Sequence, residues 1–130
     1  LRDKKNFYYI EYIDNLKIGH YLQKASILFF PMDLENPYWW CTSPLKLVEY
    51  VASGKPILGS FVGSSRELIC EYPVVEFEPS NSQEMLSKLD YLISGLPEFS
   101  MKFEKSSRNC RIITWDQRAE RILNFMHDSA

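Results

Sequence analysis

The chain has 130 residues, of which 45% are apolar and 15% aromatic, enough to build one hydrophobic core, so we expect a single domain spanning 1–130. Its 15 Lys and Arg against 17 Asp and Glu give a formal net charge of -2, without the basic excess that neutralises nucleic acid phosphates. No apolar run approaches the roughly 20 residues of a membrane-spanning helix. We therefore expect neither a nucleic acid partner nor a membrane span.

The cysteines are three in number and far apart: Cys41, Cys70 and Cys110. An odd number cannot form a closed disulfide framework, so free thiols in a reducing cytoplasm are the expectation. No group of His or Cys has the spacing of metal ligands, and no metal site is predicted.

The first half of the chain alternates between strand-like and helix-like segments. FYYIEYI at 7–13 is aromatic and β-branched and predicts a strand. Apolar residues three and four apart predict a helix at 16–25. The short run ILFF at 27–30 predicts a strand buried on both faces. Two prolines and no periodicity then predict a loop at 31–42.

The next helix is expected at 44–53, within SPLKLVEYVASGKPIL. Ser43 is a natural N-cap, and Pro44 suits the first helical position because its missing N–H costs nothing there. Gly54, followed by Pro56, marks the end of the helix.

Glu49 is the unusual residue of this helix, because it lies at the edge of the apolar stripe. A carboxylate at that edge would be partly desolvated, which costs several kcal/mol unless hydrogen-bond donors satisfy it. It can pair with Lys46 three residues earlier, or it can face a polar ligand. The expected stripe consists of Leu45, Val48, Val51 and Ala52.

The first turn of the same helix is a candidate anion site. Ser43, Pro44, Leu45 and Lys46 open the helix, where free N–H groups lie at the positive end of the helix dipole. A phosphate is well suited to that position, and Lys46 would add a formal charge. The alternative is an ordinary capped helix that binds only water.

The second half of the chain continues the alternation, with a glycine-containing corner at Gly63 and Ser64. A capping box formed by Ser80 and Gln83, or by Asn81 and Glu84, opens a helix that Gly95 closes. Thr114 and Gln117 form another capping box before the closing helix. The strands expected are at 56–61 and 73–79. The helices expected are at 64–70, 85–93, 100–111 after a Pro97 linker, and 112–127.

Alternation of this kind predicts an α/β fold, a Rossmann-like parallel sheet with helices on both faces. Ligands of such sheets bind beyond the carboxyl ends of the strands, and the loop before Ser43 occupies that position. Its aromatic residues can stack on a base or sugar, contact another domain, or cover the edge of the core. These residues are Tyr38, Trp39 and Trp40.

SPLKLVEYVASGKPIL, with ILFFP upstream and GSSREL downstream, resembles the C-terminal nucleotide-sugar-binding domain of GT-B type retaining glycosyltransferases, the group 1 family. The similarity runs from about residue 7 to 125 and includes TWDQRAERIL, which resembles the closing helix of the family. It implies the C-terminal half of a GT-B fold without its first strand and helix. The chain would then be part of a longer cytoplasmic enzyme of polysaccharide biosynthesis.

The resemblance also implies roles for single residues. Glu49 would accept hydrogen bonds from the ribose hydroxyls of a UDP- or GDP-sugar, and the turn from Ser43 to Lys46 would face the diphosphate. Many members carry an acid eight residues before that glutamate, near the transferred sugar, where this chain has Cys41. Asp33 or Glu35 could substitute for it.

Thr42, Gly63 and Ser64 complete the possible donor-site loop that the resemblance implies. No cofactor and no metal are expected, since the nucleotide-sugar is a substrate. Without the N-terminal acceptor-binding domain, the chain by itself should be inactive. The rival hypothesis is a non-enzymatic, flavodoxin-like module for ligand binding or regulation, in which Glu49 is a structural partner of Lys46.

Overall fold

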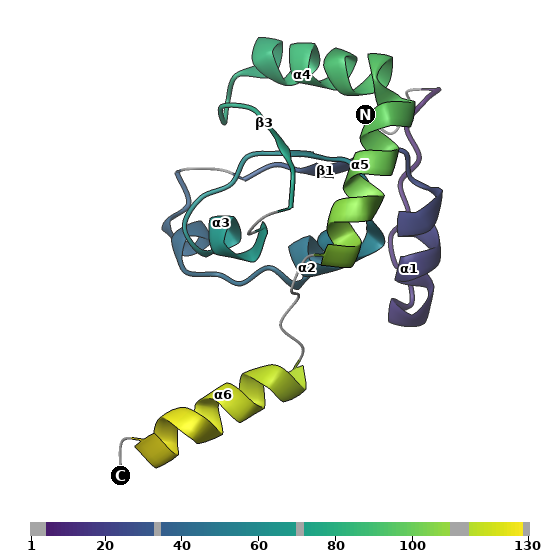
Figure 1. The fold of residues 1–130 in the computed structure, drawn as a ribbon. Helices are drawn as coiled ribbons and strands as arrows, with labels where there is room; N and C mark the ends of the chain where they lie inside the picture. The colour runs from purple at the N-terminus through teal and green to yellow at the C-terminus, as the bar shows by residue number, and fades with distance from the viewer. Residues whose placement is uncertain (1–4, 33–34, 70–71, 110–114, 129–130) are drawn as a thin grey trace.

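The computed structural model describes residues 5–32, 35–69, 72–109 and 115–128 and has an α/β architecture (Figure 1). Three parallel strands form one sheet in the order β1-β2-β3, with Leu28 opposite Ile57 and Leu58 opposite Val75. This confirms the α/β class and the parallel sheet. The strands are β1 (Leu28–Phe30), β2 (Ile57–Gly59) and β3 (Val75–Glu76). The helices are α1 (Asn15–Lys24), η1 (Pro37–Trp40), α2 (Leu45–Ser53), α3 (Ser64–Ile69), α4 (Ser82–Ser94), α5 (Leu96–Asn109) and α6 (Trp115–Asp128).

Helices lie on both faces of the sheet, with α2 and α3 on one face and α4 on the other (Figure 1). The larger core fills the α2 and α3 side, and Phe103 of α5 closes it at one end. The smaller core lies under α4. The buried residues of the larger core are Leu28, Phe30, Met32, Leu47, Val51, Ile57, Phe61, Ile69, Tyr72 and Phe103. Those of the smaller core are Leu58, Phe77 and Leu92.

Burial differs between the two longer strands. All three residues of β2 are buried, as expected of a central strand between two helical layers. In β1, Phe29 is 45% exposed and stacks on Phe77 at a ring-centroid distance of 5.8 Å. The prediction that 27–30 is buried on both faces is therefore wrong for this edge strand.

The strand predicted at 7–13 is absent from the structure. Its side chains extend into solvent, with Tyr8 88% and Tyr12 81% exposed. Aromatic and β-branched residues favour a strand only where a neighbouring strand is present to pair with, and none of the described strands pairs with 7–13. Propensity alone therefore gave the wrong prediction here.

Local capping signals explain several helix boundaries. The Asp14 carboxylate accepts the Leu16 N–H at 2.9 Å and starts α1. Of the two capping boxes proposed for α4, one half of the box at Asn81 is present, because its side chain accepts the Glu84 N–H at 3.0 Å. The Glu84 carboxylate accepts the Glu78 N–H instead of returning to the cap.

The Pro97 linker was a wrong prediction. Helix α5 begins at Leu96, directly after Gly95, and Pro97 lies in its first turn, where a missing N–H costs no helical hydrogen bond. The closing helix appears as α6, while its predicted cap, Thr114, lies outside the described residues.

Helix α6 lies apart from the α/β body in Figure 1. The apolar side chains of α6 that the structure describes are exposed, with Ile122 and Leu123 at 56% and 55%. Within the described ranges, no helix has the length and apolarity needed to cross a lipid bilayer.

Candidate functional site

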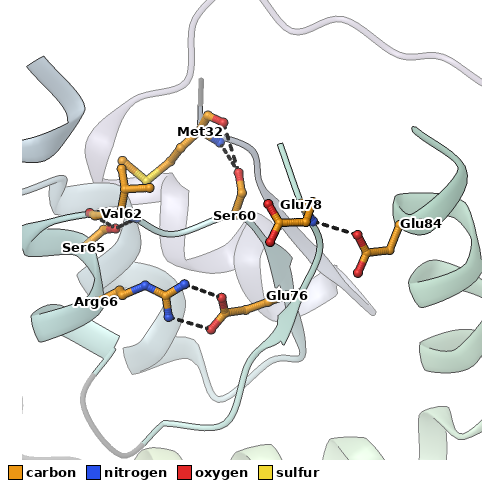
Figure 2. Close-up of polar contacts among 8 residues, drawn as sticks. All are labelled: Met32, Ser60, Val62, Ser65, Arg66, Glu76, Glu78 and Glu84. Atoms are coloured by element: carbon orange, nitrogen blue, oxygen red, sulfur yellow. Dashed lines mark hydrogen bonds and ion pairs between the residues drawn. The ribbon is translucent and has the colours of Figure 1, made fainter. Parts of the chain in front are cut away.

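The carboxyl ends of β1 and β2 are joined by the buried hydroxyl of Ser60. The Met32 N–H donates to Ser60 Oγ at 2.7 Å, and Oγ donates in return to the Met32 carbonyl at 3.1 Å (Figure 2). The Ser60 N–H also donates to the Phe30 carbonyl at 3.0 Å. This edge of the sheet, from which the chain leaves toward η1 and α3, is therefore held in a fixed position.

The start of α3 packs against the loop that precedes α2. Gly63 has a φ of +51°, and a Cβ added to it would lie 2.3 Å from the Trp40 carbonyl oxygen. The Ser64 hydroxyl donates a hydrogen bond to the Thr42 carbonyl. Because Cys41 lies between these two contacts, the structure brings four predicted donor-loop residues into one corner, in which only glycine fits at position 63.

The N-cap of α2 differs from the prediction by one position. Pro44, not Ser43, is the N-cap, and the Leu47 N–H donates to its carbonyl at 3.0 Å. Pro44 has no side chain that can accept a hydrogen bond, and no other side chain within the described ranges caps this helix. The first N–H groups of α2, at the positive end of its dipole, therefore lack the side-chain oxygen that usually satisfies them.

The apolar face of α2 also differs from the predicted stripe. Leu47 and Val51 are buried and Val48 is half-buried, whereas Leu45 is 62% exposed and Ala52 is exposed. A helix of nine residues with apolar side chains at five positions fits several faces almost equally well, and packing against the sheet buries the face that carries Leu47 and Val51. The edge at which Glu49 was expected is therefore on the solvent side.

Glu49 and Lys46 are both exposed, so the predicted desolvation of the Glu49 carboxylate is wrong. Among the described residues, no ion pair joins Glu49 to Lys46. Side chains of a helix lean toward its N-terminus, so residues 45, 46 and 49 share the face above the first turn. This face offers a carboxylate and an ammonium group next to a helix start without a side-chain cap from the described residues.

The pKa of Tyr50, the residue next to Glu49 in α2, is affected by the charge of the Glu49 carboxylate. Burial is the main cause that raises the pKa of the Tyr50 hydroxyl above its ordinary value, and the adjacent Glu49 carboxylate adds to it. The ring of Tyr50 packs edge-to-face on Phe30 at 6.2 Å. This contact links the solvent face of α2 to the core.

The remaining predicted residues occupy the loop after β1. Asp33 lies outside the described residues, and Glu35 is exposed. Cys41 is exposed, and its thiol lies 3.5 Å from the Tyr38 carbonyl. The Thr42 hydroxyl is buried and has no hydrogen-bond partner within the part of the chain that the structure describes.

A second polar feature, not predicted from the sequence, lies at the carboxyl ends of β2 and β3. It is an open hollow of about 150 Å³. The Arg66 guanidinium donates to both oxygens of Glu76 at 3.1 and 2.8 Å (Figure 2). With Glu78 and Glu84 the hollow contains three carboxylates and one guanidinium, so it disfavours phosphate. The sequence did contain one signal for this hollow, which was the pair of acidic residues at positions 76 and 78, at the end of a predicted strand.

The described residues contain no group of three or more His, Cys, Asp or Glu side chains placed to hold a metal ion. Fold and site thus define an α/β protein with a parallel sheet and a candidate anion site at its carboxyl edge. A scan against protein-family models, a search of curated proteins and a search of solved structures each found no match to this chain.

Proposed function

We propose that this chain is the nucleotide-sugar-binding domain of a GT-B type retaining glycosyltransferase. The enzyme would transfer a sugar from a UDP- or GDP-sugar to an acceptor held by a separate N-terminal domain. A cytoplasmic location and a role in polysaccharide biosynthesis accompany this proposal. It combines the resemblance of the SPLKLVEY segment with the geometry of α2.

One observation carries the proposal. Helix α2 starts near the carboxyl edge of a parallel sheet without a side-chain cap, and Lys46 and Glu49 lie exposed on the face above its first turn. A diphosphate would accept hydrogen bonds from the free N–H groups and be attracted by the Lys46 ammonium. A ribose would donate its two hydroxyls to the Glu49 carboxylate.

The proposed chemistry is electrostatic stabilisation of the leaving group. As the bond between the sugar carbon and the diphosphate oxygen breaks, the nucleoside diphosphate leaves with the electron pair. The acceptor oxygen forms the new bond to the sugar carbon, and the proton of the acceptor hydroxyl passes to the departing diphosphate oxygen. The helix dipole and Lys46 would stabilise the charge that develops on the departing oxygen. We assign no residue of this chain as acid or base.

Glu49→Gln tests the ribose contact in the complete protein encoded by the open reading frame. We expect binding of UDP-glucose or GDP-mannose, measured by isothermal titration calorimetry, to weaken by about 1–3 kcal/mol, the cost of one charged hydrogen bond. Glu98→Gln is the matched control, because Glu98 is an exposed helical glutamate in α5, outside the candidate site. Its affinity should equal that of the wild type.

Two results would contradict the proposal. The first is that the wild-type protein binds no nucleotide-sugar, and the second is that Glu49→Gln binds as tightly as the wild type. Binding without sugar transfer to any acceptor would instead favour the non-enzymatic binding module.

A further inference from the structure

The three consecutive aromatic residues of η1 are placed in two different ways. Trp39 is half-buried and packs on the larger core, whereas Tyr38 and Trp40 are 73% and 58% exposed. One exposed aromatic ring is common on protein surfaces. Here two large rings extend into solvent on either side of a residue that anchors the segment to the core.

The backbone that carries these rings is held at several points. The Asn36 side chain accepts the Tyr38 N–H at 3.1 Å, and the Tyr38 carbonyl accepts the N–H groups of Cys41 and Thr42 at 3.3 and 3.1 Å. The backbone of Trp40 lies against Gly63 so closely that no side chain fits between them. Rings that extend from a fixed backbone lose little conformational entropy when they bind a ligand.

The position of η1 relative to α2 determines which part of a ligand the rings would meet. Only residues 41–44 separate η1 from α2, so the Cα atoms of Trp40 and Leu45 are at most about 18 Å apart. In the proposed donor complex, Glu49 holds the ribose and the first turn of α2 holds the diphosphate. The sugar on the distal phosphate would then extend from that turn away from Glu49, toward the preceding segment.

We propose that the exposed ring of Trp40, the one nearer α2 along the chain, forms a stacking platform for the pyranose ring of the transferred sugar, an inference that rests on the proposed function. One face of a pyranose carries mainly C–H groups, which pack on an aromatic face while the hydroxyls remain free to bind polar groups. The Cys41 thiol, a weak donor, lies 3.5 Å from the Tyr38 carbonyl. Contact with the sugar ring would therefore come from aromatic surface and not from a charge at position 41.

The test compares ligands with and without the sugar. Isothermal titration calorimetry on the complete protein would use UDP-glucose against UDP, and GDP-mannose against GDP. We expect Trp40→Ala to weaken binding of the nucleotide-sugar about five- to tenfold and to leave the sugar-free nucleotide unchanged. Trp40→Phe, which keeps a ring, should remain near wild type. Tyr12→Ala removes an exposed ring far along the chain from η1 and should change neither affinity.

The outcomes separate this inference from the proposed function. If the wild type binds none of the four ligands, the proposed function fails and the platform with it. If the wild type binds and Trp40→Ala leaves both affinities unchanged, or weakens both equally, the platform is wrong and the donor site stands. If Trp40→Ala does not fold, saturation-transfer NMR on the wild type decides, because a platform requires transfer from aromatic protons to the sugar protons, and its absence refutes the stack.

Discussion

Gly63→Ala tests directly whether the corner between α3 and η1 exists. Gly63 combines a left-handed φ of +51° with a backbone contact in which an added Cβ would lie 2.3 Å from the Trp40 oxygen and 2.7 Å from its Cα. Real Cβ atoms do not approach other atoms that closely. Because the obstacle is backbone, no side-chain rotation can relieve the clash, and η1 must move away from α3.

The loss of stability in Gly63→Ala is the sum of several free-energy contributions. A left-handed conformation costs an alanine about 1–2 kcal/mol. Moving η1 away breaks the hydrogen bond between Ser64 and the Thr42 carbonyl, worth about 0.5–1.5 kcal/mol. Alanine also lowers the conformational entropy of the unfolded chain, which offsets about 0.4–1 kcal/mol of this loss. The backbone clash destabilises the folded state further. We expect the free energy of unfolding to fall by about 2–3 kcal/mol.

The assay is urea unfolding followed by far-UV circular dichroism, in which this loss would lower the midpoint by about 1 M or more. Gly19→Ala is the matched control, because Gly19 lies within α1, has no positive φ and has no atom within 4 Å of an added Cβ. Alanine should stabilise that helix by about 0.5–1 kcal/mol. If Gly63→Ala were as well tolerated as Gly19→Ala, the close packing of Gly63 on Trp40 would be refuted.

Two further predictions concern α2. Leu47→Ala should lower the free energy of unfolding by about 2–5 kcal/mol, because Leu47 is fully buried. Leu45→Ala should change it by less than about 0.5 kcal/mol, because Leu45 is exposed. If Leu45→Ala lowered the urea midpoint more than Leu47→Ala, the apolar stripe expected from the sequence would be the correct one. Burial, and to a smaller extent the charge of Glu49, raise the pKa of the Tyr50 hydroxyl in the folded protein above 10.0. The neutral hydroxyl therefore contributes fully to stability below the pKa of the unfolded state, about 10, and this contribution is lost as pH rises through the folded-state pKa. Tyr50→Phe should therefore lose less stability than the wild type when urea unfolding is measured at increasing alkaline pH. Glu49→Gln should lower the pKa of Tyr50 in an absorbance titration. The same loss of stability with pH in Tyr50→Phe as in the wild type, or an unchanged Tyr50 pKa in Glu49→Gln, would contradict these causes.

Much of the fold could be predicted because its signals are local. Gly54 ends α2 with a φ of +69°, as a helix-terminating glycine should, and Asn81 caps α4 through its own side chain. Such signals act within four residues and need no knowledge of the rest of the chain. The strand predicted at 7–13 failed because a strand requires a partner, and which strands pair is not a local property.

For the candidate site, the sequence indicated which residues belong to it but not which of them are exposed or what they contact. A helix start at the end of a buried strand identified the region of Ser43 to Glu49 from the sequence. The face of α2 that is buried, and with it the exposure of Glu49, depends on how the helix rotates against the sheet. The contact of Gly63 with Trp40 joins residues 23 positions apart, and no pattern in the sequence specifies it.

The position of α2 is determined by contacts other than its N-terminal cap, and this leaves its first turn available. A missing side-chain cap costs a helix about 1 kcal/mol. Burial of Leu47 and Val51 stabilises α2 by more than that, and Gly54 at its far end lies close to α5, where an added Cβ would be 3.3 Å from the Glu104 Cα. These contacts hold the helix without a side-chain cap from the described residues. The Leu47 N–H donates to the Pro44 carbonyl, so the N–H groups of Leu45 and Lys46 are the donors that an anion would meet in place of water. A side-chain cap would stabilise α2 and occupy the same donors, so its absence is what a phosphate site at this position requires.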